Sequence, residues 1–108
     1  MEETRMHYLK CWTEYFSQIT EGKKLFELRK DDRGFFIGDI IVLQEYCPYT
    51  GNYSKRSIKV IITSIVRNFE GLRDGYVILG IEPFKSIKEE LEENIEDLNI
   101  LQKDNLLW

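Results

Sequence analysis

The stretch Gly22–Arg33, GKKLFELRKDDR, combines the alternation of a β-strand with a high density of charge. It contains five basic and three acidic residues but only three large apolar ones. Side chains two apart on a strand share a face, so Glu27 and Arg29 are expected side by side. The basic residues that flank the strand are Lys23, Lys24 and Arg33. Charge gathered beside a glycine turn predicts a cleft that binds an anion.

An exposed ladder of ion pairs along the strand is the alternative for Lys24, Glu27 and Arg29, and it would add little stability. Lys24 has the opposite parity to Glu27, so the two converge only if the backbone twists or bulges just after Gly22. In a cleft, Arg29 and Lys24 would hold a phosphate or a carbonyl. Glu27 would accept a hydrogen bond from the exocyclic amine of a base, or orient Arg29.

Gly22, Lys24, Glu27 and Arg29 fit the pattern G-x-K-x-x-E-x-R, and Gly38-Asp39 follows before an apolar strand. With these motifs the chain resembles an ASCH domain, a member of the PUA-like superfamily. The flanking segments resemble a small stand-alone bacterial and phage branch of unassigned function, and the resemblance covers about residues 5–82. The flanking segments that carry this similarity are His7–Lys10, Tyr15-Phe16 and Gly75–Leu79.

The ASCH resemblance implies RNA or nucleotide recognition in a cleft. The residues expected to line it are Lys24, Glu27, Arg29, Arg33, His7, Lys10 and Tyr46. Some small ASCH proteins are instead amidohydrolases that act on an acetylated cytidine nucleoside. If this chain were such an enzyme, Lys24 and Glu27 would be its catalytic residues, although Glu27 stands where those enzymes place a threonine nucleophile.

Three candidate residues have an ordinary interpretation beside the functional one. His7 is a hydrogen-bonded structural residue, or a proton shuttle or base contact, because imidazole titrates near neutral pH. Tyr46 lies near a turn with two further tyrosines and several basic residues, a combination that can stack on single-stranded nucleic acid or simply flank a turn. Asp39 is expected to join a loop to a strand by hydrogen bonds, with a catalytic acid as the alternative.

The whole chain predicts an α+β fold, a small PUA-like β-barrel of five to six strands with an early helix and a C-terminal amphipathic helix. The helix expected at Thr13–Glu21 would be capped by Thr13 and ended by Gly22. Besides the central stretch, strands are expected at Arg5–Cys11, Asp39–Tyr46, Ser57–Val66 and Tyr76–Glu82. A closed or half-closed barrel would remove exposed strand edges.

Charge divides the chain into a barrel domain, residues 1–83, and an acidic amphipathic extension, residues 84–108. Residues 83–108 carry three lysines and seven carboxylates, which accounts for the whole net charge of −4. A neutral barrel is not a general DNA binder, so any contact with nucleic acid must come from a local patch. A regulatory or adaptor protein acting through this acidic helix is therefore a further functional alternative. The helix would dock on its own barrel, or form a homodimer or a partner contact through residues 86–104.

The remaining features predict a cytoplasmic protein without a cofactor. The sequence has no apolar run long enough to cross a membrane and no signal peptide. It also has no CxxC motif and no cluster of His and Cys, so no metal site is expected. Cys11 and Cys47 are expected to be reduced thiols, with a disulfide as the alternative.

Overall fold

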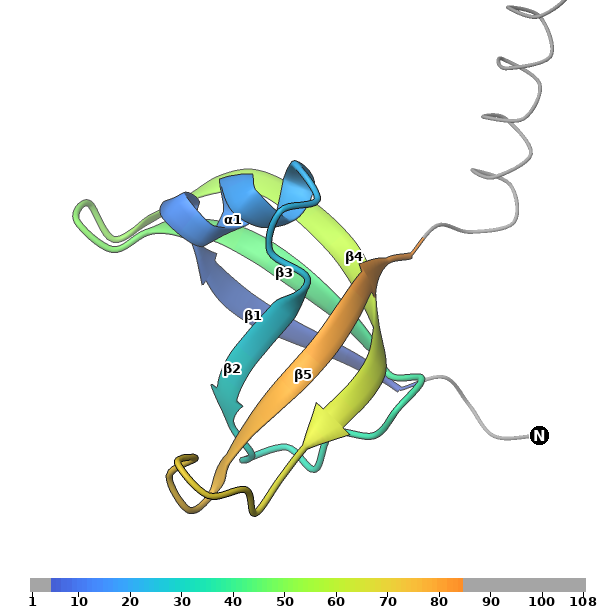
Figure 1. Ribbon diagram of the computed structural model, residues 1–108. Helices are drawn as coiled ribbons and strands as arrows, with labels where there is room; N and C mark the ends of the chain where they lie inside the picture. Colours follow the sequence, from blue (N-terminus) through green and yellow to red (C-terminus); the bar gives the residue numbers. More distant parts are fainter. Residues whose placement is uncertain (1–4, 85–108) are drawn as a thin grey trace, which may run out of the picture.

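The computed structural model describes residues 5–84 (Figure 1). The helix predicted at residues 86–104, and any docking or dimer contact through it, lies outside the described residues. In chain order the elements are β1 (Met6–Trp12), α1 (Thr13–Thr20), β2 (Phe26–Lys30), β3 (Ile40–Cys47), β4 (Asn52–Val66) and β5 (Tyr76–Pro83).

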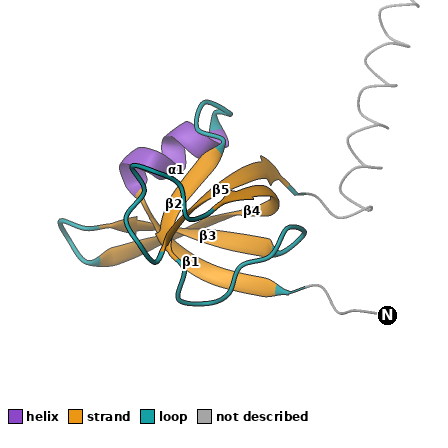
Figure 2. Cartoon of the chain, turned by 60° about the horizontal axis from the view of Figure 1, so that its bottom comes forward, coloured by secondary structure: helices purple, strands orange, loops and turns teal. Residues whose placement is uncertain are grey.

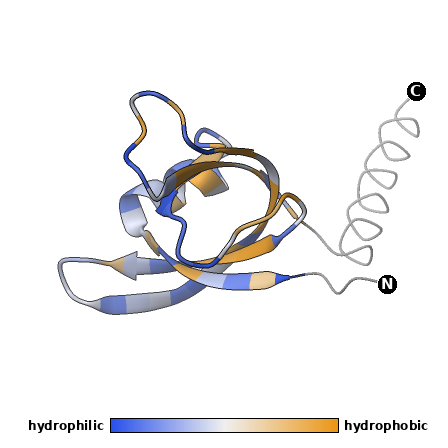
Figure 3. Ribbon diagram, turned by 90° about the horizontal axis from the view of Figure 1, so that it is seen from below, coloured by the Kyte–Doolittle hydropathy of each residue, from blue (hydrophilic) through white to orange (hydrophobic). Residues whose placement is uncertain are grey.

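The five strands form one curved sheet in the order β1-β3-β4-β5-β2. The pair β1 and β3 is parallel, and the other neighbouring pairs are antiparallel. The sheet curls into a half-barrel whose two edge strands, β1 and β2, face each other, and α1 covers one end of it (Figures 1 and 2). Seen from below, the strands form an incomplete ring, and the β3–β4 hairpin extends beyond it (Figure 3). The predicted small, sheet-dominated fold with an early helix is confirmed.

The interior of the half-barrel is filled by the inward side chains of its strands. Alternate residues of β1 are buried, as expected for an edge strand with one face in the core. The first four residues of β3, Ile40–Leu43, are buried on both faces, as the continuous apolar run predicts. The core residues with the lowest exposure are Phe35, Ile41, Leu43, Val60, Ile62, Val77 and Leu79.

The glycine that ends α1 was predicted correctly, but the residue that begins it was not. Gly22 has a φ of +74°, which favours glycine, and its amide donates to the carbonyl of Ile19 at 3.0 Å. The N-cap is Trp12, and no side chain caps this end. Thr13 is already helical, because β1 leads directly into α1, and its hydroxyl donates to the carbonyl of Tyr46 at 3.5 Å.

Strand β4 begins at Asn52, five residues before the predicted Ser57. Residues 52–57 are exposed on both faces, so they lack the apolar alternation that predicts a strand. They pair with the end of β3 through an irregular register between Gln44 and Tyr46, beside Lys55 with a φ of 74°. These residues form the outer part of the β3–β4 hairpin.

Candidate functional site

Strand β2 turns its charged face toward the interior and its apolar face outward. Glu27 is only 4% exposed and Arg29 is half-buried, whereas Phe26 and Leu28 are half exposed. The predicted alternation is confirmed. Because a buried carboxylate is stable only when it is paired, Glu27 requires cations from neighbouring residues.

Two cations supply these counter-charges. Oε1 of Glu27 accepts a hydrogen bond from Nζ of Lys24 at 2.8 Å, and Oε2 accepts one from Nε of Arg29 at 2.8 Å. Lys24 reaches Glu27 despite its parity because it precedes β2, in the turn that follows Gly22. The amides of Lys23 and Lys24 both donate to the carbonyl of Gln18, at 2.8 and 3.1 Å, which fixes this turn against α1.

Lys24, Glu27 and Arg29, here called the triad, are therefore a part-buried cluster and not an exposed ladder. The side chains of Lys24 and Arg29 are 12% and 25% exposed. Each oxygen of Glu27 is engaged by a cation, so its role is to position both cations. With two cations and one carboxylate, the triad carries one net positive charge, and it is suited to hold an anion or a carbonyl oxygen.

A cleft of about 690 Å³ opens beside the triad, between the end of β1, helix α1 and strand β2. This volume lies in the range of small-molecule sites, roughly 300–1,000 Å³. Of the seven residues predicted to line a ligand site, Lys10, Lys24, Glu27 and Arg29 line this cleft. The structure brings these four together.

Sequence reasoning missed the aromatic wall of this cleft, which is formed by Trp12, Tyr15 and Phe26. All three are 39–50% exposed, and the rings of Trp12 and Tyr15 stack with centroids 6.2 Å apart. Nζ of Lys24 lies 5.4 Å from the ring centroid of Tyr15 and 4.8 Å from that of Phe26, within range of cation–π attraction. Gln18 adds an amide to the lining. The signal that the sequence offered was Phe26, an aromatic residue on the face of β2 opposite Glu27.

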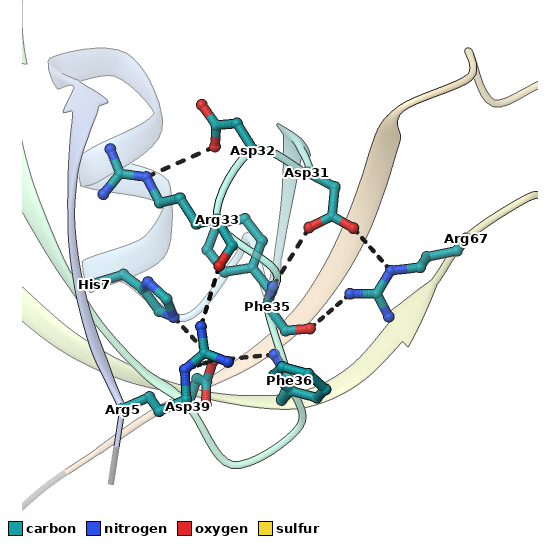
Figure 4. A network of polar contacts seen from close by, with 9 residues as sticks. All are labelled: Arg5, His7, Asp31, Asp32, Arg33, Phe35, Phe36, Asp39 and Arg67. Carbon is teal, nitrogen blue, oxygen red and sulfur yellow. Dashed lines mark hydrogen bonds and ion pairs between the residues drawn. The ribbon is translucent and has the colours of Figure 1, made fainter.

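The other three predicted residues, His7, Arg33 and Tyr46, lie outside the lining of the cleft. His7 is buried, and its Nε2 lies 2.9 Å from Oδ2 of Asp39 (Figure 4). The same oxygen accepts a hydrogen bond from the amide of Phe36 at 3.0 Å. The predicted role of Asp39, a hydrogen-bonding link from loop to strand, is confirmed, and His7 belongs to that link.

Arg29 of β2 bridges the gap between the two edge strands, here called the seam, and Arg33, in the loop that follows β2, makes a similar contact to β1. Nη2 of Arg29 donates to the carbonyl of Lys10, and Nη1 of Arg33 donates to that of Tyr8 at 3.2 Å. Both carbonyls belong to β1, which has no neighbouring strand on this side. Guanidinium groups thus satisfy edge carbonyls that a closed barrel would satisfy with backbone amides.

Cys11, the cysteine that lines this cleft, does not have the properties of a nucleophile, whereas hydrogen bonds from Thr50 lower the pKa of Cys47, which lies outside the cleft. Both Cys11 and Cys47 are free thiols. Burial, followed by the nearby charge of Glu27, raises the pKa of Cys11 to about 11, so this cleft residue stays protonated at neutral pH. Within residues 5–84, no group of three or more His, Cys, Asp or Glu side chains could hold a metal ion. No helix in the same range is long and apolar enough to cross a membrane.

A third buried carboxylate, Glu45, was not predicted; it lies opposite the cleft residue Cys11 in the pairing of β1 with β3. It is 3% exposed, and Arg56 binds it with two hydrogen bonds, Nε to Oε1 at 2.9 Å and Nη2 to Oε2 at 2.8 Å. The guanidinium of Arg56 also lies over the ring of Phe16 in α1, at 5.3 Å. The hydrogen bonds from Arg56, followed by that from Ser54, hold the pKa of Glu45 below its ordinary value of 4.5.

This pair predicts a pH dependence of stability. Because the pKa of Glu45 is lowered in the folded state, its stabilising contribution is fully present above pH 4.5 and is lost as pH falls through the lower folded value. We expect Arg56→Gln to have a lower free energy of unfolding than the native protein at neutral pH. In acid, the two free energies should become similar. Urea unfolding at about pH 7 and about pH 3 measures both differences. A difference that stays constant with pH would contradict this role for the pair.

Together these features define a small half-open β-barrel domain with an ion-paired cleft beside its seam. The chain belongs to the family described as a domain of unknown function (DUF3850), which matches residues 6–81. It is also 35% identical, over 75 residues, to the protein described as "Uncharacterized 12.9 kDa protein in GpA 3'region" from Escherichia phage P2. That alignment covers 69% of this chain and 66% of the phage protein. The family match spans nearly all of the described barrel, the triad included.

Proposed function

We propose that this protein is an ASCH-type module that binds RNA or a nucleotide in the cleft beside the triad. The observation that carries the proposal is the placement of two cations, held by one buried carboxylate, against a wall of exposed aromatic side chains. Nucleotides combine an anionic phosphate with a flat base, and these two surfaces match the two parts of the ligand.

The contacts of the triad support a phosphate-binding role for Arg29 and Lys24. Nζ of Lys24 is held by Oε1 of Glu27 and by the carbonyl of Phe26 at 2.7 Å. Nε and Nη2 of Arg29 are used by Glu27 and by the carbonyl of Lys10, and the described residues provide no partner for Nη1. A phosphate oxygen at Nη1 would gain a charge-assisted hydrogen bond from a guanidinium that is already fixed in place. Fixing the donor in advance reduces the entropy that binding loses.

The same contacts favour binding over amide hydrolysis. A general base must be free to accept a proton from water, but both oxygens of Glu27 are engaged by cations. The thiol of Cys11 stays protonated and offers no alternative nucleophile. Incubation with acetylcytidine is accordingly expected to release no cytidine.

Replacing Arg29 with alanine tests the proposal. We expect the affinity for a nucleoside monophosphate to fall about 10- to 100-fold, the size of one lost hydrogen bond to a charged group. Isothermal titration measures this change. Lys30→Ala is the matched control, because Lys30 is the next residue of β2 and faces away from the interior. Equal affinities of the Arg29 and Lys30 variants, with the fold intact by circular dichroism, would contradict the proposal.

A further inference from the structure

Trp12 separates two hollows on the surface of the barrel. One is the cleft beside the triad, and the other is a pocket of about 340 Å³ that Trp12 also lines. The second pocket is lined by residues at the beginning of α1 and by the turn that follows β3, including Tyr49, which is 95% exposed. A ligand that fills the cleft can therefore continue past the indole of Trp12 toward the β3–β4 hairpin.

A row of aromatic side chains also leads from Trp12 across strands β3 and β4. In the pairing of β1 with β3, Trp12 lies opposite Tyr46, and in the pairing of β3 with β4, Tyr46 lies opposite Tyr53. The rings of Tyr46 and Tyr53 contact each other, with centroids 5.0 Å apart. At the other end of the row, Trp12 stacks on Tyr15 inside the cleft, with ring planes 20° apart. We call these four residues, Tyr15, Trp12, Tyr46 and Tyr53, the aromatic track.

Lysine side chains lie close to the rings of the aromatic track. Nζ of Lys24 lies 5.4 Å from the ring centroid of Tyr15, and Nζ of Lys10 lies 4.5 Å from that of Tyr46. Lys55, on the exposed part of the hairpin, follows Tyr53 by two residues. Glu14 lines the second pocket together with Trp12 and brings a negative charge to that pocket. Phosphates are therefore expected on the lysine side of the track, and a neutral base in the pocket beside Glu14.

From this arrangement we infer that the natural ligand is a single-stranded nucleic acid several nucleotides long, whose bases stack along the aromatic track. The inference rests on the proposed function, since it extends the nucleotide of the cleft into a strand. Rings alternating with cations fit a chain of bases joined by phosphates. Duplex bases already stack on one another and present no faces to these rings, so a duplex gains only the phosphate contacts.

The track also agrees with the neutral charge of the barrel. A protein that binds by phosphate contacts alone needs a large basic surface, which residues 1–82 do not have, because their basic and acidic residues are equal in number. Stacking contributes affinity without net charge. Trp12 and Tyr53 are both 49% exposed, so their rings are accessible to bases without rearrangement of the core.

Fluorescence anisotropy with the full chain tests the inference. The probes are labelled single-stranded RNA and DNA oligomers of about four to eight nucleotides, the corresponding duplexes, and a nucleoside monophosphate as competitor. We expect single strands to bind more tightly than the monophosphate and than the duplexes. A preference for RNA over DNA would reveal a contact to the 2′-hydroxyl, and equal binding would mean that rings and phosphates suffice.

Tyr53→Ala separates the track from the cleft, because Tyr53 does not line the cleft. We expect this change to weaken binding of the oligomer roughly 5- to 100-fold, the range for one lost base stack, and to leave binding of the monophosphate unchanged. Tyr53→Phe keeps the ring and should retain the affinity of the native protein. Phe69→Ala is the matched control, since Phe69 is 67% exposed and lies outside the track.

The outcomes distinguish failure of the track from failure of the proposed function. If the monophosphate binds in an Arg29-dependent way, but Tyr53→Ala does not affect the oligomer or duplexes bind as tightly as single strands, the track is wrong and the proposed function stands. If neither the monophosphate nor any oligomer binds, the proposed function fails and the track fails with it.

Discussion

Replacing Glu27 with glutamine is expected to lower the free energy of unfolding by about 3 kcal/mol, the scale of breaking a buried ion pair from one side. Glutamine keeps the size of the side chain but removes its charge, and Lys24 and Arg29 then lie close together without a counter-charge. Both cations are largely buried, at 12% and 25% exposure, so water cannot fully replace the carboxylate. Urea unfolding of the two proteins measures the difference.

The same substitution is expected to weaken binding of a nucleoside monophosphate, although Glu27 need not touch the ligand. Without its carboxylate, Arg29 loses the contact at Nε that fixes its orientation. Glu21→Gln is the matched control, because Glu21 pairs with Lys23 at 2.9 Å but its side chain is 55% exposed. An exposed pair of this kind contributes less than about 1 kcal/mol. If Glu27→Gln is as stable as Glu21→Gln and binds the nucleoside monophosphate equally tightly, Glu27 does not position Lys24 and Arg29 for binding.

Replacing Asp39 with alanine is the second change with a large expected effect, about 3 kcal/mol of unfolding free energy. In the network of Figure 4, Oδ2 of Asp39 accepts hydrogen bonds from His7 at 2.9 Å and from the amide of Phe36 at 3.0 Å, and it forms an ion pair with Arg5 at 3.7 Å. Removing the carboxylate leaves the buried imidazole and the amide without a partner. Such orphaned groups cost far more than the hydrogen bonds themselves contribute.

Asp32→Ala is the control for this prediction. Asp32 lies in the same loop and pairs with Arg33 at 3.7 Å, but its side chain is 59% exposed, so its loss is expected to change stability by less than about 1 kcal/mol. The folded fraction of Asp39→Ala should bind nucleotides as the native protein does, because this network lies outside the cleft. Loss of binding by a folded Asp39→Ala protein would instead make His7 part of the site.

The sequence of β2 predicted the pairing of Glu27 with Arg29, because side-chain alternation on a strand is a local property. The convergence of Lys24 was left open, since it depends on a turn whose conformation is set by hydrogen bonds to Gln18. The sequence also did not show which face of β2 points inward. Phe26 and Leu28 would ordinarily be buried, and only the counter-charges around Glu27 allow the opposite orientation.

Residues contributed by distant elements were harder to predict. The aromatic wall joins Trp12 and Tyr15 to Phe26 only after α1 and Gly22 return the chain beside β1. His7, Arg33 and Tyr46 were grouped with the triad by residue type, but the register of β1 against β3 places His7 opposite Ile41, in the core. Sequence proximity and charge carry no information on that register, which depends on tertiary packing.

The seam has a mechanical consequence for the barrel. Where β1 faces β2, the strands are joined by the side chain of Arg29, with Arg33 of the following loop nearby, and not by a ladder of backbone hydrogen bonds with fixed spacing. A change of side-chain rotamer can therefore widen or narrow this joint while every strand pairing of the sheet stays intact. We therefore expect the mouth of the cleft, where its walls come from the unpaired strands β1 and β2, to change width more readily than the paired parts of the sheet.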